Sequence, residues 1–208
     1  MLDRAIELLP SVYNLVRNHV MQRTEALQLI EQFGVSPRLK AHLLAVEAAV
    51  RHYAVKNSAN PDLWGLAGLL HDADWEAHPA DHPQVIIQLL RERGEQELAV
   101  AINGHGGKGA IARTTNLSKV LFACDELSGF IVAYSYLKPG GISQITAAKV
   151  LKKLKDKSFA ATVSRVDIDQ GAKEVGLIVE QHVAEVLLAL QAAATSLPSL
   201  SFALHGKA

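Results

Sequence analysis

The chain has 208 residues, of which 49% are hydrophobic and 20% are charged, so it is long enough for one domain with a sizeable core. Lys and Arg balance Asp and Glu at 21 each, which excludes the strongly basic field that drives non-specific nucleic-acid binding. The single cysteine, Cys124, excludes an intramolecular disulfide and a zinc site built from several thiolates. No secretory signal and no membrane-length apolar segment is recognisable, so we expect a cytoplasmic protein without a membrane partner.

Apolar residues recur at three- and four-residue spacings, with almost no alternating stretch of β-branched residues, which predicts an all-α fold. The expected N-caps are Thr24, Ser36, Asn60 and Asp81, two of which precede a proline that suits the first helical turn. The pattern predicts helices at residues 24–33, 37–56, 61–71, 81–93, 95–102 and 118–137.

Pro139-Gly140-Gly141 is the clearest break in the pattern. We therefore expect one domain over residues 1–208, with a core bundle at about 20–137 and two further helices at about 142–197. The last of these helices is apolar around Val183 and is able to pack against the bundle or against a second subunit, so a homo-oligomer stays open.

His71-Asp72 is the most informative pair of residues. It ends the apolar run that spans residues 63–70. Such a run buries itself and then presents an imidazole and a carboxylate at the edge of the core, where polar groups need a partner. A metal ion is the partner that suits both groups.

Further metal-competent residues surround this pair in the sequence. The full set of expected ligands is His42, His71, Asp72, His82, His105 and Asp125. A mixed nitrogen and oxygen shell suits iron, manganese, cobalt or zinc better than magnesium alone. Six ligands exceed the need of one catalytic ion, whereas two ions that share Asp72 would use them all.

Any one of these histidines, taken alone, is more often a hydrogen-bonded structural residue than a ligand. The grouping of the six is what favours a metal site. His78 competes with His82, because the two are one helical turn apart, and we prefer His82 because it opens a regular helix.

The order His42, His71-Asp72, Asp125 resembles the HD superfamily of metal-dependent phosphohydrolases, over about residues 36–135. In that family these positions bind one ion, and histidines at positions such as 82 and 105 are similar to those of subfamilies that hold two. Residues 152–160 also resemble a stretch shared by a small group of uncharacterised HD hydrolases. The chain lacks the Gly-Tyr-Pro motif of the branch that cleaves cyclic dinucleotides, which argues against that substrate.

The resemblance implies an all-α HD-type bundle that hydrolyses a small phosphate ester, with a nucleotide as the expected class and mono- against diester left open. Asp72 would bridge the ions, and Asp74 or Glu76 would accept a proton or hold a water molecule. The alternative for Asp74 and Glu76 is an exposed loop position with no role.

A phosphate substrate also needs cationic side chains to bind it. The expected contacts are Lys108, Lys152, Lys153, Lys157 and Arg165. The alternative for the lysine run is an ordinary solvated helix face.

Two other functions compete with hydrolysis. The same six ligands resemble the diiron oxygenases of this superfamily, of which inositol oxygenase is one, and ligand chemistry alone does not separate oxidation from hydrolysis. A non-catalytic helical interaction module is the second alternative, but such a module has no need to retain six ligands.

Overall fold

The structure is a computed structural model that describes residues 21–107 and 109–196. Within these residues the chain is all-helical and contains no strand, which confirms the predicted all-α class. The helices are α2 (Arg23–Gln32), α3 (Pro37–Lys56), α4 (Pro61–Leu70), α5 (Gln84–Glu92), α6 (Gln96–Asn103), α7 (Asn116–Ser135), the 3-10 turn η1 (Gly141–Gln144), α8 (Ala147–Leu154), α9 (Arg165–Glu174) and α10 (Val179–Ser196).

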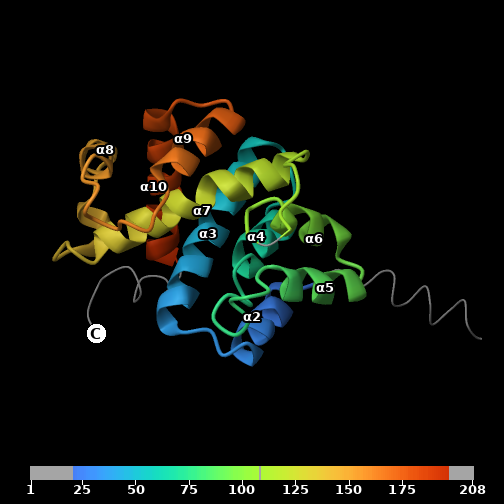
Figure 1. Cartoon of the computed structure of the whole chain (residues 1–208). Helices are drawn as coiled ribbons and strands as arrows, with labels where there is room; N and C mark the ends of the chain where they lie inside the picture. The colour runs from blue at the N-terminus through green and yellow to red at the C-terminus, as the bar shows by residue number, and fades with distance from the viewer. Residues whose placement is uncertain (1–20, 108, 197–208) are drawn as a thin grey trace, which may run out of the picture.

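Helices α3, α4 and α7 form the centre of the molecule, with α5 and α6 on one side and α9 and α10 on the other (Figure 1). Their facing side chains, among them Leu43, Leu69 and Leu127, are completely buried. Helices α3 and α4 approach closely at Gly68, where a Cβ atom would lie only 2.8 Å from the backbone nitrogen of Glu47. This packing fixes the two helices that present His42 and His71.

Two of the four expected N-caps are present and two are wrong. The side chains of Ser36 and Asn60 accept hydrogen bonds from the first backbone N–H groups of α3 and α4. Helix α2 already begins at Arg23, after Gln22, so Thr24 does not cap it.

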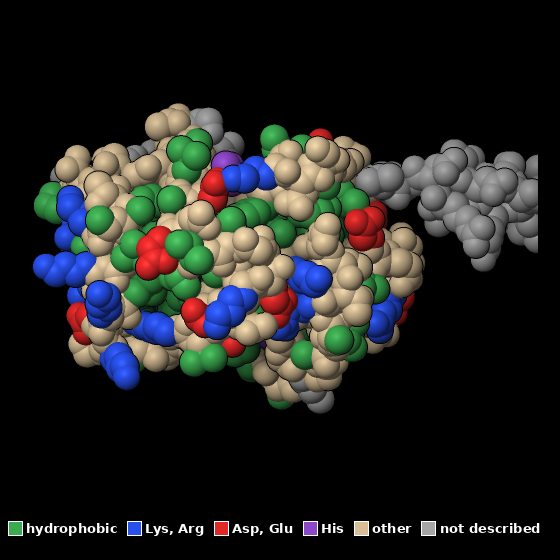
Figure 2. Space-filling model, turned by 90° about the horizontal axis from the view of Figure 1, so that it is seen from above, with side chains coloured by type: hydrophobic (Ala, Val, Ile, Leu, Met, Phe, Trp, Pro, Cys, Tyr) green, Lys and Arg blue, Asp and Glu red, His purple; other side chains and the backbone are tan. Residues whose placement is uncertain are grey.

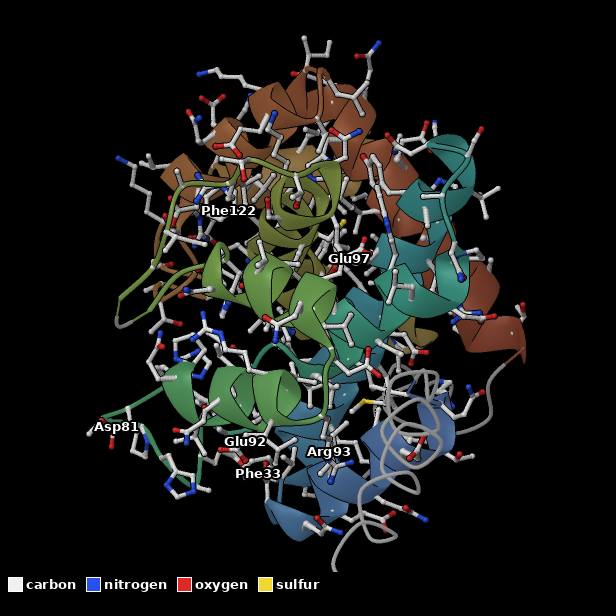
Figure 3. All side chains as sticks on the ribbon, turned by 90° about the vertical axis from the view of Figure 1, so that its right-hand side faces the viewer. Phe33, Asp81, Glu92, Arg93, Glu97 and Phe122 are labelled. Atoms are coloured by element: carbon white, nitrogen blue, oxygen red, sulfur yellow. The ribbon has the colours of Figure 1, made fainter. Side chains whose placement is uncertain are left out.

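Helix α5 begins at Gln84 rather than at Asp81, because hydrogen-bonded turns hold the preceding residues. The backbone N–H groups of His82 and Gln84 donate to the carbonyl oxygens of His78 and Asp81, at 2.9 and 2.7 Å. Asp81 lies at the outer edge of these turns (Figure 3). His82 therefore stands before the helix, in a turn, and not in its first turn.

Between Pro139 and residue 196, where the described part ends, the chain contains three α-helices and a 3-10 turn, not the two helices that we expected. The loop at residues 155–164 divides α8 from α9, which starts where Ser164 accepts a hydrogen bond from the backbone N–H of Asp167. Gly171 brings α9 onto α7, since a Cβ atom there would lie 2.6 Å from Cα of Ala123. All three helices belong to one continuous apolar core with the bundle.

The surface carries basic and acidic side chains interspersed over the face shown in Figure 2. Among the described helices, no single one is long and apolar enough to cross a membrane. Helices α9 and α10 meet the length and composition criteria only as a pair, with a bend of 92° between them.

Candidate metal centre

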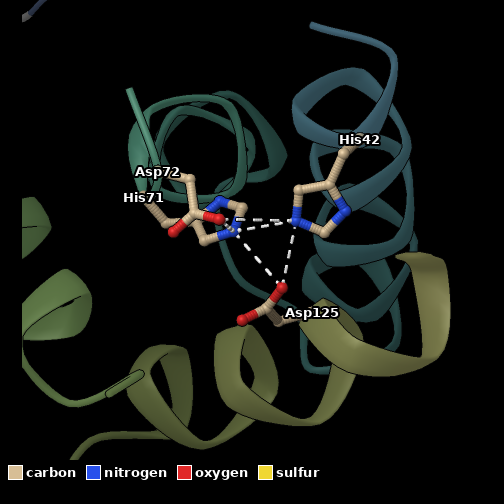
Figure 4. A group of neighbouring side chains, drawn as sticks. All are labelled: His42, His71, Asp72 and Asp125. Atoms are coloured by element: carbon tan, nitrogen blue, oxygen red, sulfur yellow. Dashed lines mark hydrogen bonds and ion pairs between the residues drawn. The ribbon is translucent and has the colours of Figure 1, made fainter. Parts of the chain in front are cut away.

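The first ligand group consists of His42 on α3, His71 and Asp72 at the end of α4, and Asp125 on α7 (Figure 4). Nε2 of His42 lies 3.1 Å from Oδ1 of Asp125 and 3.2 Å from Nε2 of His71. Nε2 of His71 lies 3.4 Å from both Oδ2 of Asp72 and Oδ1 of Asp125. Ligand atoms about 2.1 Å from one ion lie roughly 3.0 to 3.4 Å apart, so the group is spaced for a metal ion.

The second ligand group consists of Asp72, His82 and His105. Oδ1 of Asp72 lies 3.2 Å from Nε2 of His82 and 3.3 Å from Nε2 of His105. The two oxygens of Asp72 thus face different groups, Oδ2 the first and Oδ1 the second. The structure brings all six expected ligands together, in two groups that share Asp72.

In three histidines a hydrogen bond at Nδ1, the ring nitrogen that faces away from the ligand groups, fixes the orientation of the ring. Nδ1 of His71 lies 2.9 Å from the carbonyl oxygen of Gly68, and Nδ1 of His105 lies 2.6 Å from that of Ile102. Nδ1 of His82 lies 2.6 Å from Oδ1 of Asp74. Because these acceptors take the Nδ1 proton, the Nε2 lone pairs face the ligand groups, as metal binding requires. The residues present therefore fit a divalent transition metal.

The electrostatics of the cluster also favour a cation. Burial alone would lower the pKa of His71, but the charges of Asp72 and Asp125 outweigh burial and hold that pKa well above its usual value. Burial alone would raise the pKa of Asp72, but His71 and the other histidines hold it well below its usual value. Two partly buried carboxylates that stay charged among imidazoles need positive charge, from protons or from metal.

Asp74 is fully buried, so the alternative of an exposed loop position is wrong for it. Its Oδ1 accepts from His82, and its Oδ2 accepts from the backbone N–H of Ile86 at 3.0 Å. Both carboxylate oxygens of Asp74 are thus hydrogen-bonded, and Asp74 is not among the residues that line the cavity described below.

Glu76, unlike Asp74, is exposed. Its carboxylate accepts hydrogen bonds of 2.7 Å from both the backbone N–H and the hydroxyl of Ser36. It therefore fastens the turn after α4 to the start of α3, while also lining the cavity described below. His78 is exposed and packs edge-on against Phe33, outside the ligand groups, so the choice of His82 over His78 agrees with the geometry.

A cavity of about 1180 Å³ opens over the two ligand groups. One wall is a single face of α7 that runs from Asp125 past Gly129 to Tyr136. The other walls come from the start of α3, the turn after α4, the loop after α6, and the loop before α9. Their lining residues are Arg38, Leu39, Trp75, Glu76, Gly106, Gly107, Phe159, Ala160, Thr162 and Val163.

The expected substrate cations that the structure describes do not line this cavity. Lys152 and Lys157 are exposed, and Lys153 pairs with Asp156 at 2.9 Å, so the alternative of a solvated face describes the run better. Lys108 lies outside the described residues.

Arg165, the remaining expected cation, donates to four backbone carbonyls of the loop that walls the cavity. The acceptors are those of Asp156, Phe159, Ala160 and Val163. Arg165 thus holds the loop in shape and does not reach into the cavity.

Arg38 and Glu126 line the cavity and were missed by sequence reasoning. Arg38 precedes His42 by four residues, and this one-turn spacing on α3 is the signal that could have found it. Glu126 follows Asp125 and accepts a hydrogen bond of 3.1 Å from the backbone N–H of Ser164. Burial, followed by the nearby charge of Asp125, raises the pKa of Glu126 to about 7.

Comparison with known protein families identifies the fold. The model of the HD domain matches residues 39–129, a span that contains all six residues of the two ligand groups. Searches of curated proteins and of solved structures found no match. An HD domain is typical of metal-dependent hydrolases, and the buried His and Asp groups are able to hold a metal ion. Residues 39–129 are therefore an HD domain.

Proposed function

We propose that this protein hydrolyses a small phosphate ester with the help of one or two divalent transition-metal ions. The observation that carries the proposal is the position of the two ligand groups, which share Asp72 and face an open cavity of about 1180 Å³. A metal bound there would supply an acidified water molecule and would neutralise charge on the phosphoryl oxygens.

The reaction forms a bond between the oxygen of water and phosphorus, breaks the P–O ester bond, and moves a proton to the leaving oxygen. The buried carbonyls and Asp74 keep the imidazoles of His71, His82 and His105 in the tautomer that binds metal. The cavity walls orient the organic group of the ester and exclude bulk water.

Arg38 supports a phosphate substrate in particular. It lies one helical turn from His42 on the cavity side of α3, and it makes no hydrogen bond or salt bridge to another described residue. A guanidinium in this position is available to an anionic oxygen.

The test begins with metal analysis of protein purified without chelators or added metal. A panel of phosphomonoesters, phosphodiesters and nucleotides with Mn²⁺ or Fe²⁺ then follows under anaerobic conditions. We expect bound metal and hydrolysis without oxygen, with both lost in His71→Ala and retained in the control His78→Ala. Oxygen consumption with an oxidised product would instead identify an oxygenase, and protein that is empty of metal and inactive would identify a binding module.

A further inference from the structure

We infer that the cavity is built for a phosphate monoester whose organic group is apolar and at least as large as one ring, and that chains of several phosphates fit it poorly. This inference rests on the proposed hydrolysis and names its substrate class. Besides the metal ligands, the cavity is lined by a few charged side chains and by a set of apolar and aromatic ones.

The charges around the cavity favour a single phosphate. Among the described lining residues Arg38 is the only Lys or Arg, whereas three lining carboxyl groups lie outside the ligand groups: Glu76, Glu126 and Asp167. A second and third phosphate would extend beyond the metal ligands towards these carboxyl groups, with Arg38 alone to offset the added charge. Like charges brought together in this way oppose binding.

Apolar and aromatic side chains also line the cavity. They are those of Leu39, Trp75, Val132, Ala133, Tyr136, Phe159 and Val163. Trp75 and Tyr136 leave 50% and 44% of their surface exposed, although large aromatic side chains are normally covered. Trp75 stands edge-on to His82, with ring centroids 5.0 Å apart, so an apolar surface begins directly beside the second ligand group. An organic group in the cavity would cover these two aromatic side chains.

The length of the α7 wall, from Asp125 to Tyr136, indicates how large the organic group of the ester can be. Asp125 and Tyr136 lie on the same face of α7, and eleven residues of helix correspond to about 16 Å. Between them the lining residues of α7 are Glu126, Gly129, Val132 and Ala133. The last three have small or short side chains, and the carboxylate of Glu126 accepts a hydrogen bond from the backbone N–H of Ser164. Gly129 keeps the wall open beside His42, since a Cβ atom there would lie 3.3 Å from Nδ1 of that histidine. A phosphate held at Asp125 therefore leaves room for a ring before Tyr136 is reached.

Fluorescence of Trp75 provides a test that does not depend on turnover. The chain has two tryptophans, and Trp64 is buried in the core, so the variant Trp64→Phe leaves Trp75 as the sole reporter. The probes are phenylphosphonate and methylphosphonate, which carry the same phosphonate group and are not hydrolysed, titrated into Zn²⁺-loaded protein. We expect phenylphosphonate to bind at least about tenfold more tightly.

The wall is tested by Tyr136→Ala, compared with the control Leu137→Ala, whose side chain is exposed outside the cavity. The preference for phenylphosphonate should shrink in the first variant and persist in the second. In turnover, kcat/KM for phenyl phosphate should exceed that for a nucleoside triphosphate by at least about tenfold.

Equal binding of the two phosphonates by protein that hydrolyses phosphate esters would overturn this inference and leave the proposed function intact. Preferred binding of a nucleoside triphosphate, with that preference lost in Lys108→Ala, would also overturn it. Failure of metal-loaded protein to bind either phosphonate or to hydrolyse any ester would overturn the proposed function itself.

Discussion

The two ligand groups are positioned by different kinds of structure. His42 and Asp125 lie within long helices, and His71 follows α4 directly, where α3 and α4 touch at Gly68. His82 and His105, in contrast, lie between helices and are oriented by one hydrogen bond each. Helix packing therefore holds the first group, whereas the second group depends on single contacts. Substitutions should affect the two groups separately, except at the residue that they share.

Asp72→Ala should produce the largest effect, because Asp72 gives one oxygen to each group. We expect both ions to be lost and activity to fall at least about a hundredfold, with little change in helical content. Metal analysis and circular dichroism measure this, with Asp169→Asn as an exposed acidic control. Full retention of one ion would show that the groups do not share this carboxylate.

His82→Ala and His105→Ala should remove the second ion and leave the first. The reason is that neither imidazole belongs to the first group. The metal content should fall from about two ions per chain to about one, whereas His42→Ala should spare the second ion instead. Loss of both ions in equal measure from His82→Ala would contradict this division.

Asp74→Asn tests the hydrogen bond between Nδ1 of His82 and the carboxylate of Asp74. The amide keeps the size of the side chain but replaces a charged acceptor that also binds the backbone N–H of Ile86. We expect about 10- to 100-fold weaker binding of the second ion, measured by competition with a chelator. An unchanged affinity would mean that the turn holds His82 without this carboxylate.

Gly68→Ala tests the packing that holds the first group. The added Cβ would lie within 2.9 Å of backbone atoms of Val46 and Glu47, which cannot move aside as a side chain can. The free energy of unfolding should fall by about 1 to 3 kcal/mol in a denaturant titration. Gly65→Ala on the same helix is the control, since its Cβ would meet only the flexible side chain of Arg51.

The smallest expected effect is a pH dependence of stability from His182, which joins α10 to α3 and α7. Its Nδ1 accepts from the hydroxyl of Tyr53 at 2.7 Å, and its Nε2 donates to the carbonyl of Ala123 at 2.8 Å. Burial lowers the pKa of His182 in the folded protein, so the unfolded chain binds the proton more readily. This contribution to the free energy of unfolding is complete above about pH 6.5 and declines as the pH falls further.

Urea titrations at pH 7.5 and 5.5 measure this decline. The difference in unfolding free energy between the two pH values should shrink in His182→Gln, which cannot take up the proton. An identical difference in the two proteins would exclude His182 as its source.

The sequence predicted the helices and the ligands because both depend on local patterns. Apolar spacing and the caps Ser36 and Asn60 define α3 and α4, and a buried run that ends in His71-Asp72 marks the centre. The partner of Asp74 was not predictable, because it depends on how the turn before α5 folds back. The sequence also left two interpretations of the lysine run after residue 148, substrate contacts or a solvated face, since composition does not tell which way a helix face points.

The loop between α8 and α9 contributes no ligand, yet it forms one side of the cavity. Arg165, the first residue after this loop, donates hydrogen bonds to the loop's backbone carbonyls and so stabilises its conformation. The loop can therefore vary in sequence without a direct effect on the metal ligands. Substitutions within residues 156–163 should change which molecules the cavity accepts and leave both ligand groups intact.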